Sequence, residues 1–143
     1  MSIKILFTAT STATGGRNGH SEASDGSVSV NLSVPKEMGG EGKPNTTTPE
    51  HLFATGYAAC FSGAVDLVAK KKKLNLTDAT VTCSVSIGSQ SEGGYGLAAK
   101  LHVKTQGISQ AEAEQLIEDA HKICPYSNAT RNNIQVDLDV EAV

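Results

Sequence analysis

The chain has 143 residues, a formal net charge of -3, 38% hydrophobic residues and no tryptophan. A chain of this length is predicted to fold as a single domain over residues 1–143, with a core large enough to need no disulfide or structural metal. The acidic balance argues against binding to nucleic acid or to anionic membranes, and no apolar run approaches the ~20 residues of a membrane span.

The first third of the chain is predicted to form strands. Polar and apolar residues alternate within residues 3–13 and, most cleanly, within residues 27–34, as is typical of half-buried strands. A glycine-rich turn at residues 15–19 lies between them, so we predict a hairpin with Arg17 near its tip. The loop that follows, residues 35–48, is rich in Gly, Pro and Thr, and so long a loop in a small domain is more often functional or mobile than idle.

A long helix is predicted to begin at Thr48, the N-cap, with Pro49 at the first helical position and Glu50 in the first turn. It runs to about Lys72, and its centre is apolar on nearly every face. Such a helix is buried on most sides. The lysines at its end, residues 70–73, are interpreted as a solvated helix terminus that complements the helix dipole.

The second half of the chain alternates between strands and a helix. Strands are predicted at residues 79–88 and 97–105, and a final strand at 134–140. A capping box opens a helix at residues 109–112, and Pro125 ends it. One face of that helix is apolar and is expected to join the core: Leu116, Ile117, Ala120 and Ile123.

This order of elements predicts an α+β fold, with largely antiparallel sheets packed on a long buried central helix. Hairpin connections dominate the predicted strands, which favours antiparallel pairing. One thin sheet covers only one side of a helix that is apolar all round. We therefore expect a second subunit to cover the other side, which makes the protein a homodimer.

Two of the three cysteines are candidates for thiol redox chemistry. The N-terminal apolar stretch is too short for a secretory signal, which predicts a cytoplasmic protein whose thiols stay reduced. Cys60 lies in an apolar helical run, and Cys124 ends a helical pattern just before Pro125. Both fit the interpretation of small buried hydrophobes, and both fit a pair that cycles between dithiol and disulfide. Cys83 shares the core face of its strand and is interpreted as structural.

A reactive cysteine needs a cation or a helix N-terminus nearby to lower the pKa of its thiol. Cys60 lies mid-helix, so the cation has to come from elsewhere, and Arg17 in its glycine-flanked turn is the candidate. Glu50 matches Arg17 for a bidentate contact. Glu50 and Cys60 are ten residues apart on one helix, about 15 Å along its axis. If the two share a site, Glu50 is expected to come from the other subunit.

Metal binding and hydrolase chemistry are the competing uses of these residues. The sequence has no C-x-x-C pair, and its four histidines are scattered. His121 and Cys124 have the spacing of two ligands, but a zinc site needs more. There is also no G-x-S-x-G elbow for a serine hydrolase. We therefore do not expect a metal site.

Four segments together resemble a known family. They are residues 13–19, 48–54, 56–61 and 124–131, which read Ala-Thr-Gly-Gly-Arg-Asn-Gly, Thr-Pro-Glu-His-Leu-Phe-Ala, Gly-Tyr-Ala-Ala-Cys-Phe and Cys-Pro-Tyr-Ser-Asn-Ala-Thr-Arg. In this order they resemble the organic hydroperoxide resistance (Ohr) branch of the OsmC/Ohr superfamily. The likeness covers essentially the whole chain, and the last segment points to the Ohr branch over the OsmC branch.

The resemblance implies a thiol-dependent peroxidase built as an intertwined homodimer. It implies that Cys60 is the peroxidatic cysteine and Cys124 the resolving one, with Arg17 and Glu50 holding the thiolate and the peroxide. It further implies organic hydroperoxides as substrates, a dithiol reductant such as a lipoylated protein, and no cofactor. The alternative is a non-catalytic dimer on the same fold that binds an apolar ligand or senses oxidants.

Apolar side chains near these segments are expected to line a channel for the alkyl tail of the peroxide. The candidates are Met38, Phe53, Tyr57 and Phe61.

Overall fold

The computed structural model describes residues 2–143, which form two compact units. The first unit ends at Leu52 and the second is Phe53–Val143. The long helix α1 (Pro49–Lys71) begins in the first unit and continues into the second. The prediction of a single domain stays a prediction, and each unit is described by itself.

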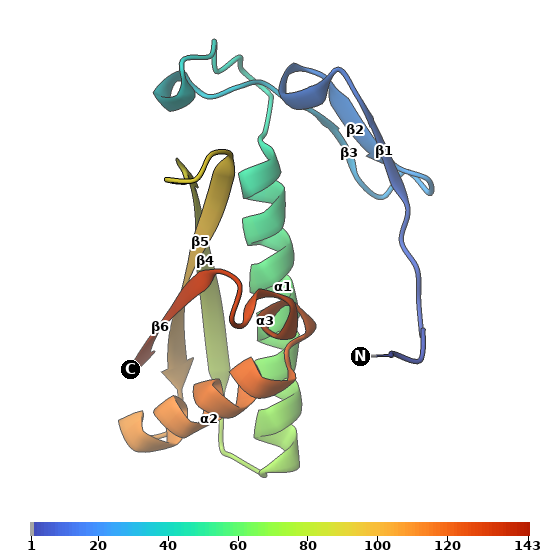
Figure 1. The fold of residues 1–143 in the computed structure, drawn as a ribbon. Coiled ribbons are helices and arrows are strands. Elements are labelled where there is room, and N and C mark those ends of the chain that lie inside the picture. The colour runs from blue at the N-terminus through green and yellow to red at the C-terminus, as the bar shows by residue number, and fades with distance from the viewer. Residues whose placement is uncertain (1) are drawn as a thin grey trace. The chain divides into compact units, whose positions relative to one another are not determined.

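The first unit is a small antiparallel sheet of three short strands in the order β1-β2-β3 (Figure 1). The strands are β1 (Ser11–Thr14), β2 (His20–Ala23) and β3 (Ser29–Asn31). Short 3-10 helices follow β1 and β3: η1 (Gly16–Asn18) and η2 (Lys36–Met38).

The predicted hairpin exists, but its strands differ from those expected. Residues 3–10, all described, carry no strand, and β1 pairs with β2 rather than directly with residues 27–34. The reason lies in the turn, where Gly15 and Gly16 have φ values of 77° and 59°. This left-handed backbone is open to glycine and reverses the chain within five residues, so the nearest partner is the segment that follows at once. Arg17 does lie at the tip, in η1.

The second unit packs α1 and two shorter helices on a second sheet, ordered β4-β5-β6 (Figure 1). Its strands are β4 (Asp78–Ser89), β5 (Tyr95–Gln106) and β6 (Gln135–Ala142). The helices are α2 (Gln110–Ile123) and α3 (Pro125–Thr130). β4 and β5 are antiparallel, whereas β5 and β6 are parallel, with Leu101 opposite Leu138.

The parallel pair has a simple cause. Parallel strands need a crossover connection of a dozen or more residues, and α2 with α3 forms that crossover between β5 and β6. The remaining pairings are antiparallel, so the predicted α+β fold with largely antiparallel sheets and a long central helix is confirmed.

The core of the second unit lies between α1, α2 and the inner face of the sheet. Its completely buried side chains include Tyr57, Phe61, Val65, Leu101, Val103 and Leu116. The capping box that opens α2 is present as predicted, with Ser109 and Glu112 bonded reciprocally. Ile123, predicted to face the core, is 44% exposed at the end of α2, where it borders a hollow beside Leu67 and Val68 of α1.

The length and apolar composition of helix α1 contradict one expectation from the sequence. Among residues 2–143 it is the one helix long and apolar enough to cross a membrane, so the expectation that no apolar run approaches that length is wrong. Tyr57, Phe61 and Val65 on this helix have no exposed surface and join the central cluster. The core helix of a soluble protein meets the same criteria of length and composition, and α1 is that helix.

Candidate active site

The first turn of α1 presents Glu50 in a fixed position. The backbone N–H of His51 donates to Thr48 Oγ1 over 3.1 Å, which is the predicted N-cap contact. Pro49 occupies the first helical position, where its missing N–H costs nothing. Glu50 therefore projects from a capped helix start, where the helix dipole favours a carboxylate.

Glu50 binds Arg17 through both of its oxygens. Arg17 Nη1 donates to Glu50 Oε2 over 2.9 Å, and Nη2 donates to Oε1 over 2.6 Å. This is the bidentate contact that their geometry predicted. The Arg17 hydrogen bonds hold the pKa of the Glu50 carboxyl below its ordinary value of 4.5, against the opposing effect of burial. The first unit thus contains an oriented guanidinium with an ionised carboxylate behind it.

The second unit contains the two cysteines side by side. Cys124 Sγ donates a hydrogen bond to Cys60 Sγ over 3.6 Å. Cys60 projects from α1, while Cys124 is at once the C-cap of α2 and the N-cap of α3. From the sequence we predicted that Pro125 ends a helix, here α2. We did not predict that the same proline also starts α3. That double cap fixes Cys124 at a corner of the chain facing α1.

The two thiols differ in burial. Cys124 has no exposed surface, whereas Cys60 is only partly buried. Burial raises the pKa of the Cys60 thiol above its ordinary value, and the backbone N–H of Tyr126, which donates to this sulfur, acts in the opposite direction. Cys124 adds to the rise, first through the hydrogen bond between the two thiols and then because two thiolates this close would repel each other. Of these effects on the pKa of Cys60, only the hydrogen bond from the Tyr126 N–H stabilises the thiolate.

A buried polar network holds α3 against α1 beside the cysteines. The hydroxyls of Tyr57 and Ser127 lie 2.8 Å apart, and His121 Nδ1 lies 2.8 Å from Ser127 Oγ. Thr130 Oγ1 lies 3.3 Å from Tyr57 Oη. Sequence reasoning missed Ser127 and Thr130, and it considered His121 only as a possible metal ligand. The signal was present in part, since Ser127 and Thr130 share a helix face with three-residue spacing after Pro125.

The sequence and the structure are similar to those of known proteins. Residues 40–139 match the family model for OsmC-like protein. The organic hydroperoxide resistance protein of Xanthomonas axonopodis pv. citri is 48% identical over 136 residues, which cover 94% of each chain. The chain belongs to the OsmC/Ohr family. Ohr proteins are cysteine-based peroxidases of organic hydroperoxides.

Solved structures agree with this family assignment. An organic hydroperoxide resistance protein from Elizabethkingia anophelis, with thiocyanate bound, superposes with a TM-score of 0.93 at 46% identity, covering 99% of this chain and 100% of the other. A putative organic hydroperoxide resistance protein from Vibrio cholerae, with captopril bound in one of its active sites, has a TM-score of 0.91 at 44% identity, covering 98% and 95%. The similarity to the Ohr family spans both units.

The channel residues expected in this Ohr-family chain lie in different surroundings. Tyr57 and Phe61 are completely buried in the core of the second unit, and Phe53 is partly buried against the same core. Met38 lies in η2 of the first unit and is 40% exposed. Phe53 packs edge-on to Tyr126, whose ring in turn lies over Gly56, where a Cβ would be 3.0 Å from the Tyr126 hydroxyl.

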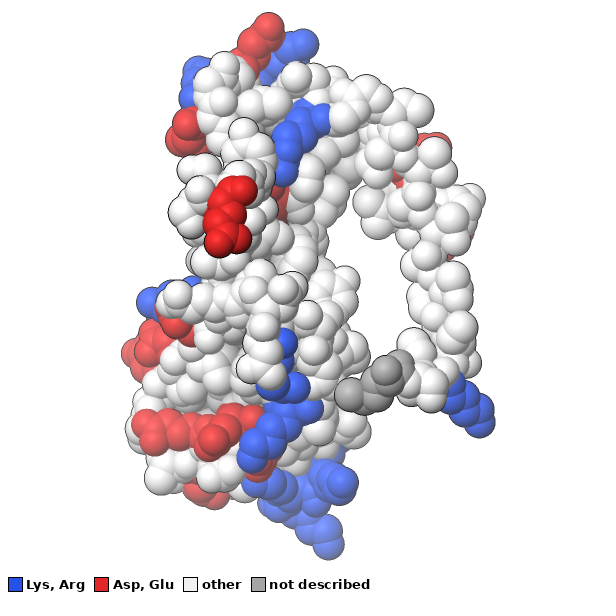
Figure 2. Space-filling model, in the orientation of Figure 1, with Lys and Arg blue, Asp and Glu red and all other residues white. Residues whose placement is uncertain are grey.

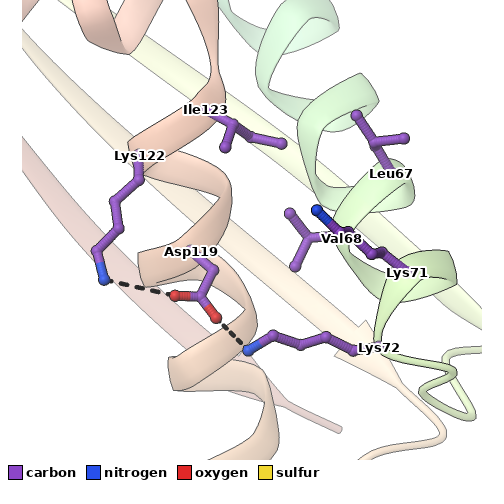
Figure 3. A pocket seen from close by; sticks show the side chains of 7 residues that line it. All are labelled: Leu67, Val68, Lys71, Lys72, Asp119, Lys122 and Ile123. Carbon is purple, nitrogen blue, oxygen red and sulfur yellow. Dashed lines mark hydrogen bonds and ion pairs between the residues drawn. The ribbon is translucent and has the colours of Figure 1, made fainter.

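A separate hollow of about 540 Å³ lies between the ends of α1 and α2. Figure 3 shows its apolar side chains, Leu67, Val68 and Ile123, with Asp119 bridging Lys72 and Lys122 at its edge. Basic side chains gather at this end of the second unit (Figure 2), where Lys70 and Lys71 form the last turn of α1 and Lys72 and Lys73 follow it. Across residues 2–143, no three His, Cys, Asp or Glu side chains gather closely enough to hold a metal ion.

Proposed function

We propose that this protein is a cytoplasmic, dithiol-dependent peroxidase that reduces organic hydroperoxides to alcohols. The observation that carries the proposal is the 3.6 Å separation of the Cys60 and Cys124 sulfurs. A disulfide needs about 2.05 Å, so a shift of about 1.5 Å joins them. Such a pair is suited to a redox cycle, and relatives with 48% identity are named for resistance to organic hydroperoxides.

The cycle balances without a cofactor. The Cys60 thiolate attacks the terminal oxygen of the hydroperoxide, the O–O bond breaks, and the alkoxide leaves and takes up a proton as the alcohol. Cys60 is then a sulfenic acid. Cys124 attacks the sulfenic sulfur, forming the Cys60–Cys124 disulfide and releasing water. A dithiol, for example a dihydrolipoyl group on a lipoylated protein, returns the pair to thiols and is itself oxidised to a disulfide.

The cation for the Cys60 thiolate is proposed to be Arg17 of a second copy of the chain. Helix α1 is continuous from Pro49 to Lys71, so Glu50 and Cys60 on one copy are about 15 Å apart along its axis. Glu50 therefore orients Arg17 toward a cysteine that its own helix does not bring near. An intertwined homodimer, in which each copy supplies the Arg17–Glu50 pair to the other, completes two sites. The guanidinium then stabilises the thiolate and the departing alkoxide.

Specificity for organic peroxides is proposed to come from apolar surroundings. Phe53 is partly buried on the same helix as Cys60 and is proposed to contact the tail, as is the exposed Met38 of the first unit. Tyr57 and Phe61 have no exposed surface, so their part is to support Phe53 from within the core. Burying apolar surface stabilises a bound alkyl chain by about 25 cal/mol per Å², a gain that hydrogen peroxide does not obtain.

The test is a thiol count and peptide mass map of reduced protein before and after one equivalent of cumene hydroperoxide, with hydrogen peroxide in parallel. We expect a Cys60–Cys124 disulfide that forms faster with the organic peroxide. Cys60→Ser should abolish turnover, while Cys124→Ser should stop after one turnover with Cys60 as sulfenic acid or further oxidised. Cys83→Ser is the matched control and should cycle normally.

Turnover that survives loss of Cys60 would remove it from its role. Oxidation of Cys60 without sustained peroxide consumption in the presence of a dithiol would favour the non-catalytic binding or sensing protein.

A further inference from the structure

The corner between α2 and α3 carries two groups that meet the sulfur of Cys60. Cys124 Sγ lies 3.6 Å from Cys60 Sγ, and the backbone N–H of Tyr126 donates to the same sulfur. Cys124 and Tyr126 lie on either side of Pro125 in the chain. Whatever holds this corner in place therefore sets both contacts of the Cys60 sulfur.

His121, in the last turn of α2, holds α3 by both of its ends. His121 Nδ1 lies 2.8 Å from Oγ of Ser127, near the start of α3, and the His121 carbonyl accepts from Nη2 of Arg131, the C-cap of α3, over 2.5 Å. The His121 ring also packs against the ring of Phe61, with centroids 6.4 Å apart. Because Phe61 directly follows Cys60 on α1, this one residue links α1, α2 and α3 beside the two sulfurs.

The hydrogen bonds of the buried hydroxyls give the imidazole a defined part. Burial, and then the positive charge of Arg131, lower the pKa of His121 below its ordinary value of 6.5, which favours the neutral ring. A neutral ring with its hydrogen on Nε2 accepts from Ser127 at Nδ1, while Ser127 accepts from Tyr57 over 2.8 Å and Thr130 donates to the Ser127 carbonyl. Without the imidazole, the completely buried Ser127 hydroxyl loses this acceptor. Because a buried polar group that loses a partner costs free energy, the corner is then held less tightly.

We propose that His121 is a positioning residue that keeps Cys124 within reach of Cys60 and so sets how readily their disulfide closes. This inference rests on the proposed function, in which that disulfide follows the sulfenic acid. From a separation of 3.6 Å, the sulfurs need a shift of about 1.5 Å to form the bond. A thiol held in place reacts at a far higher effective concentration than a free one, and a loosened corner lowers that effective concentration.

Fast closure also protects Cys60 from further oxidation. While Cys60 is a sulfenic acid, a second hydroperoxide can transfer its terminal oxygen to the sulfur, which gives a sulfinic acid and a second molecule of alcohol. Closure by Cys124 instead forms the disulfide and releases water. A corner that closes slowly leaves the sulfenic acid exposed to this second reaction for longer. We therefore expect His121 to decide the balance between disulfide and sulfinic acid.

The first test measures disulfide closure without peroxide. Variants in a Cys83→Ser background are equilibrated with mixtures of dithiothreitol and its oxidised form, and the Cys60–Cys124 disulfide is quantified by mass. His121→Leu should lower the equilibrium constant for the disulfide about tenfold. His121→Asn should restore most of this loss, because the asparagine Oδ1 takes the place of Nδ1 as the acceptor for Ser127. Ser127→Ala removes the same contact from the other side and serves if His121→Leu does not fold.

A control separates positioning from loss of helix stability. Ser109→Ala weakens the start of α2 at its capping box and should leave the equilibrium constant unchanged in folded protein. The inference is overturned by a wild-type equilibrium constant in His121→Leu, by an equal fall in Ser109→Ala, or by His121→Asn behaving like His121→Leu.

The second test measures the balance of products with increasing cumene hydroperoxide. Sulfinic acid on Cys60 should appear in His121→Leu at a peroxide concentration about tenfold lower than in wild type, and His121→Asn should resemble wild type. Equal sulfinic acid in all three proteins would overturn the role of His121 in closure. If the wild-type protein consumes no peroxide, the proposed function fails, whereas the equilibrium with dithiothreitol still tests His121 by itself.

Discussion

The thiolate of Cys60 needs more stabilisation than its own unit provides. Burial raises the pKa of its thiol, and the Tyr126 backbone N–H offsets only part of that effect. A nucleophilic thiolate needs a nearby cation, and the structure contains an oriented one in the Arg17–Glu50 pair. At the scale of single residues, the question is whether that guanidinium sets the reactivity of Cys60.

Replacing Arg17 tests this directly. Arg17→Ala should raise the pKa of the Cys60 thiol and slow its oxidation by cumene hydroperoxide about 100-fold, as expected for loss of one charge-stabilising group. Arg17→Lys keeps the charge but loses the bidentate contact with Glu50, so its effect should be smaller. Thiolate absorbance against pH and stopped-flow oxidation measure both effects. An unchanged thiolate titration in Arg17→Ala would place the cation elsewhere.

The Arg17–Glu50 contact also makes a pH-dependent contribution to stability. The pKa of Glu50 is lowered in the folded protein by Arg17, so the contact is fully stabilising above the ordinary glutamate pKa. It is lost as the pH falls through the lowered value. Glu50→Gln should therefore melt below wild type at pH 7, and the difference should shrink below the ordinary value of 4.5. A difference in melting temperature that is constant from pH 7 to pH 3 would contradict this.

At the scale of elements, a few helix ends place the site. Cys124 caps the end of α2 and the start of α3, so its position depends on where α2 begins and ends. The start is fixed by the capping box of Ser109 and Glu112. The end is fixed by Pro125, which cannot continue α2 but suits the first turn of α3.

Breaking the capping box should lower stability without altering the chemistry. Ser109→Ala should cost about 1 kcal/mol of unfolding free energy, or roughly 3–5 °C in melting temperature for a chain of this size. Ser109→Asp is the matched control, because aspartate caps equally well. Peroxide turnover per folded molecule should be the same in all three proteins. Loss of turnover in folded Ser109→Ala would mean that α2 positions Cys124 more tightly than its cap implies.

At the scale of the whole molecule, the proposed site is shared between two copies. The first unit holds the cation and the second holds the thiols, while α1 separates Glu50 from Cys60 along its length. Four large apolar side chains near the N-terminus are also mostly exposed, a further reason to expect a partner: Ile3, Ile5, Leu6 and Phe7. A dimer has a mass of twice the 14.8 kDa of the chain, which sedimentation measures directly.

Mixing two impaired variants tests the sharing. Alone, Arg17→Ala should keep only about 1% of wild-type activity and Cys60→Ser should have none. Unfolded together in equal amounts and refolded, half of the dimers are mixed, and each mixed dimer has one site with both Arg17 and Cys60 intact. About a quarter of wild-type activity should then return. No recovery from dimers shown to be mixed would place Arg17 and Cys60 of one site on the same copy.

The sequence alone determined most of the local structure of this protein. Thr48, Pro49 and Glu50 predicted the start of α1, and alternation predicted β4 with Cys83 on its inner face, because caps and side-chain periods are local properties. The family motifs also indicated the four site residues, and the bidentate Arg17–Glu50 contact followed from matching geometry.

The tertiary structure decided what depends on contacts between distant segments. Residues 3–10 form no strand, and β6 is parallel because α2 and α3 carry the chain across the sheet. The 3.6 Å approach of two cysteines 64 residues apart, and the complete burial of one of them, likewise come from packing. The local sequence sets whether a segment tends to form a helix or a strand. The pairing partner of a strand, its direction and the solvent access of a side chain depend on how distant segments pack in the core.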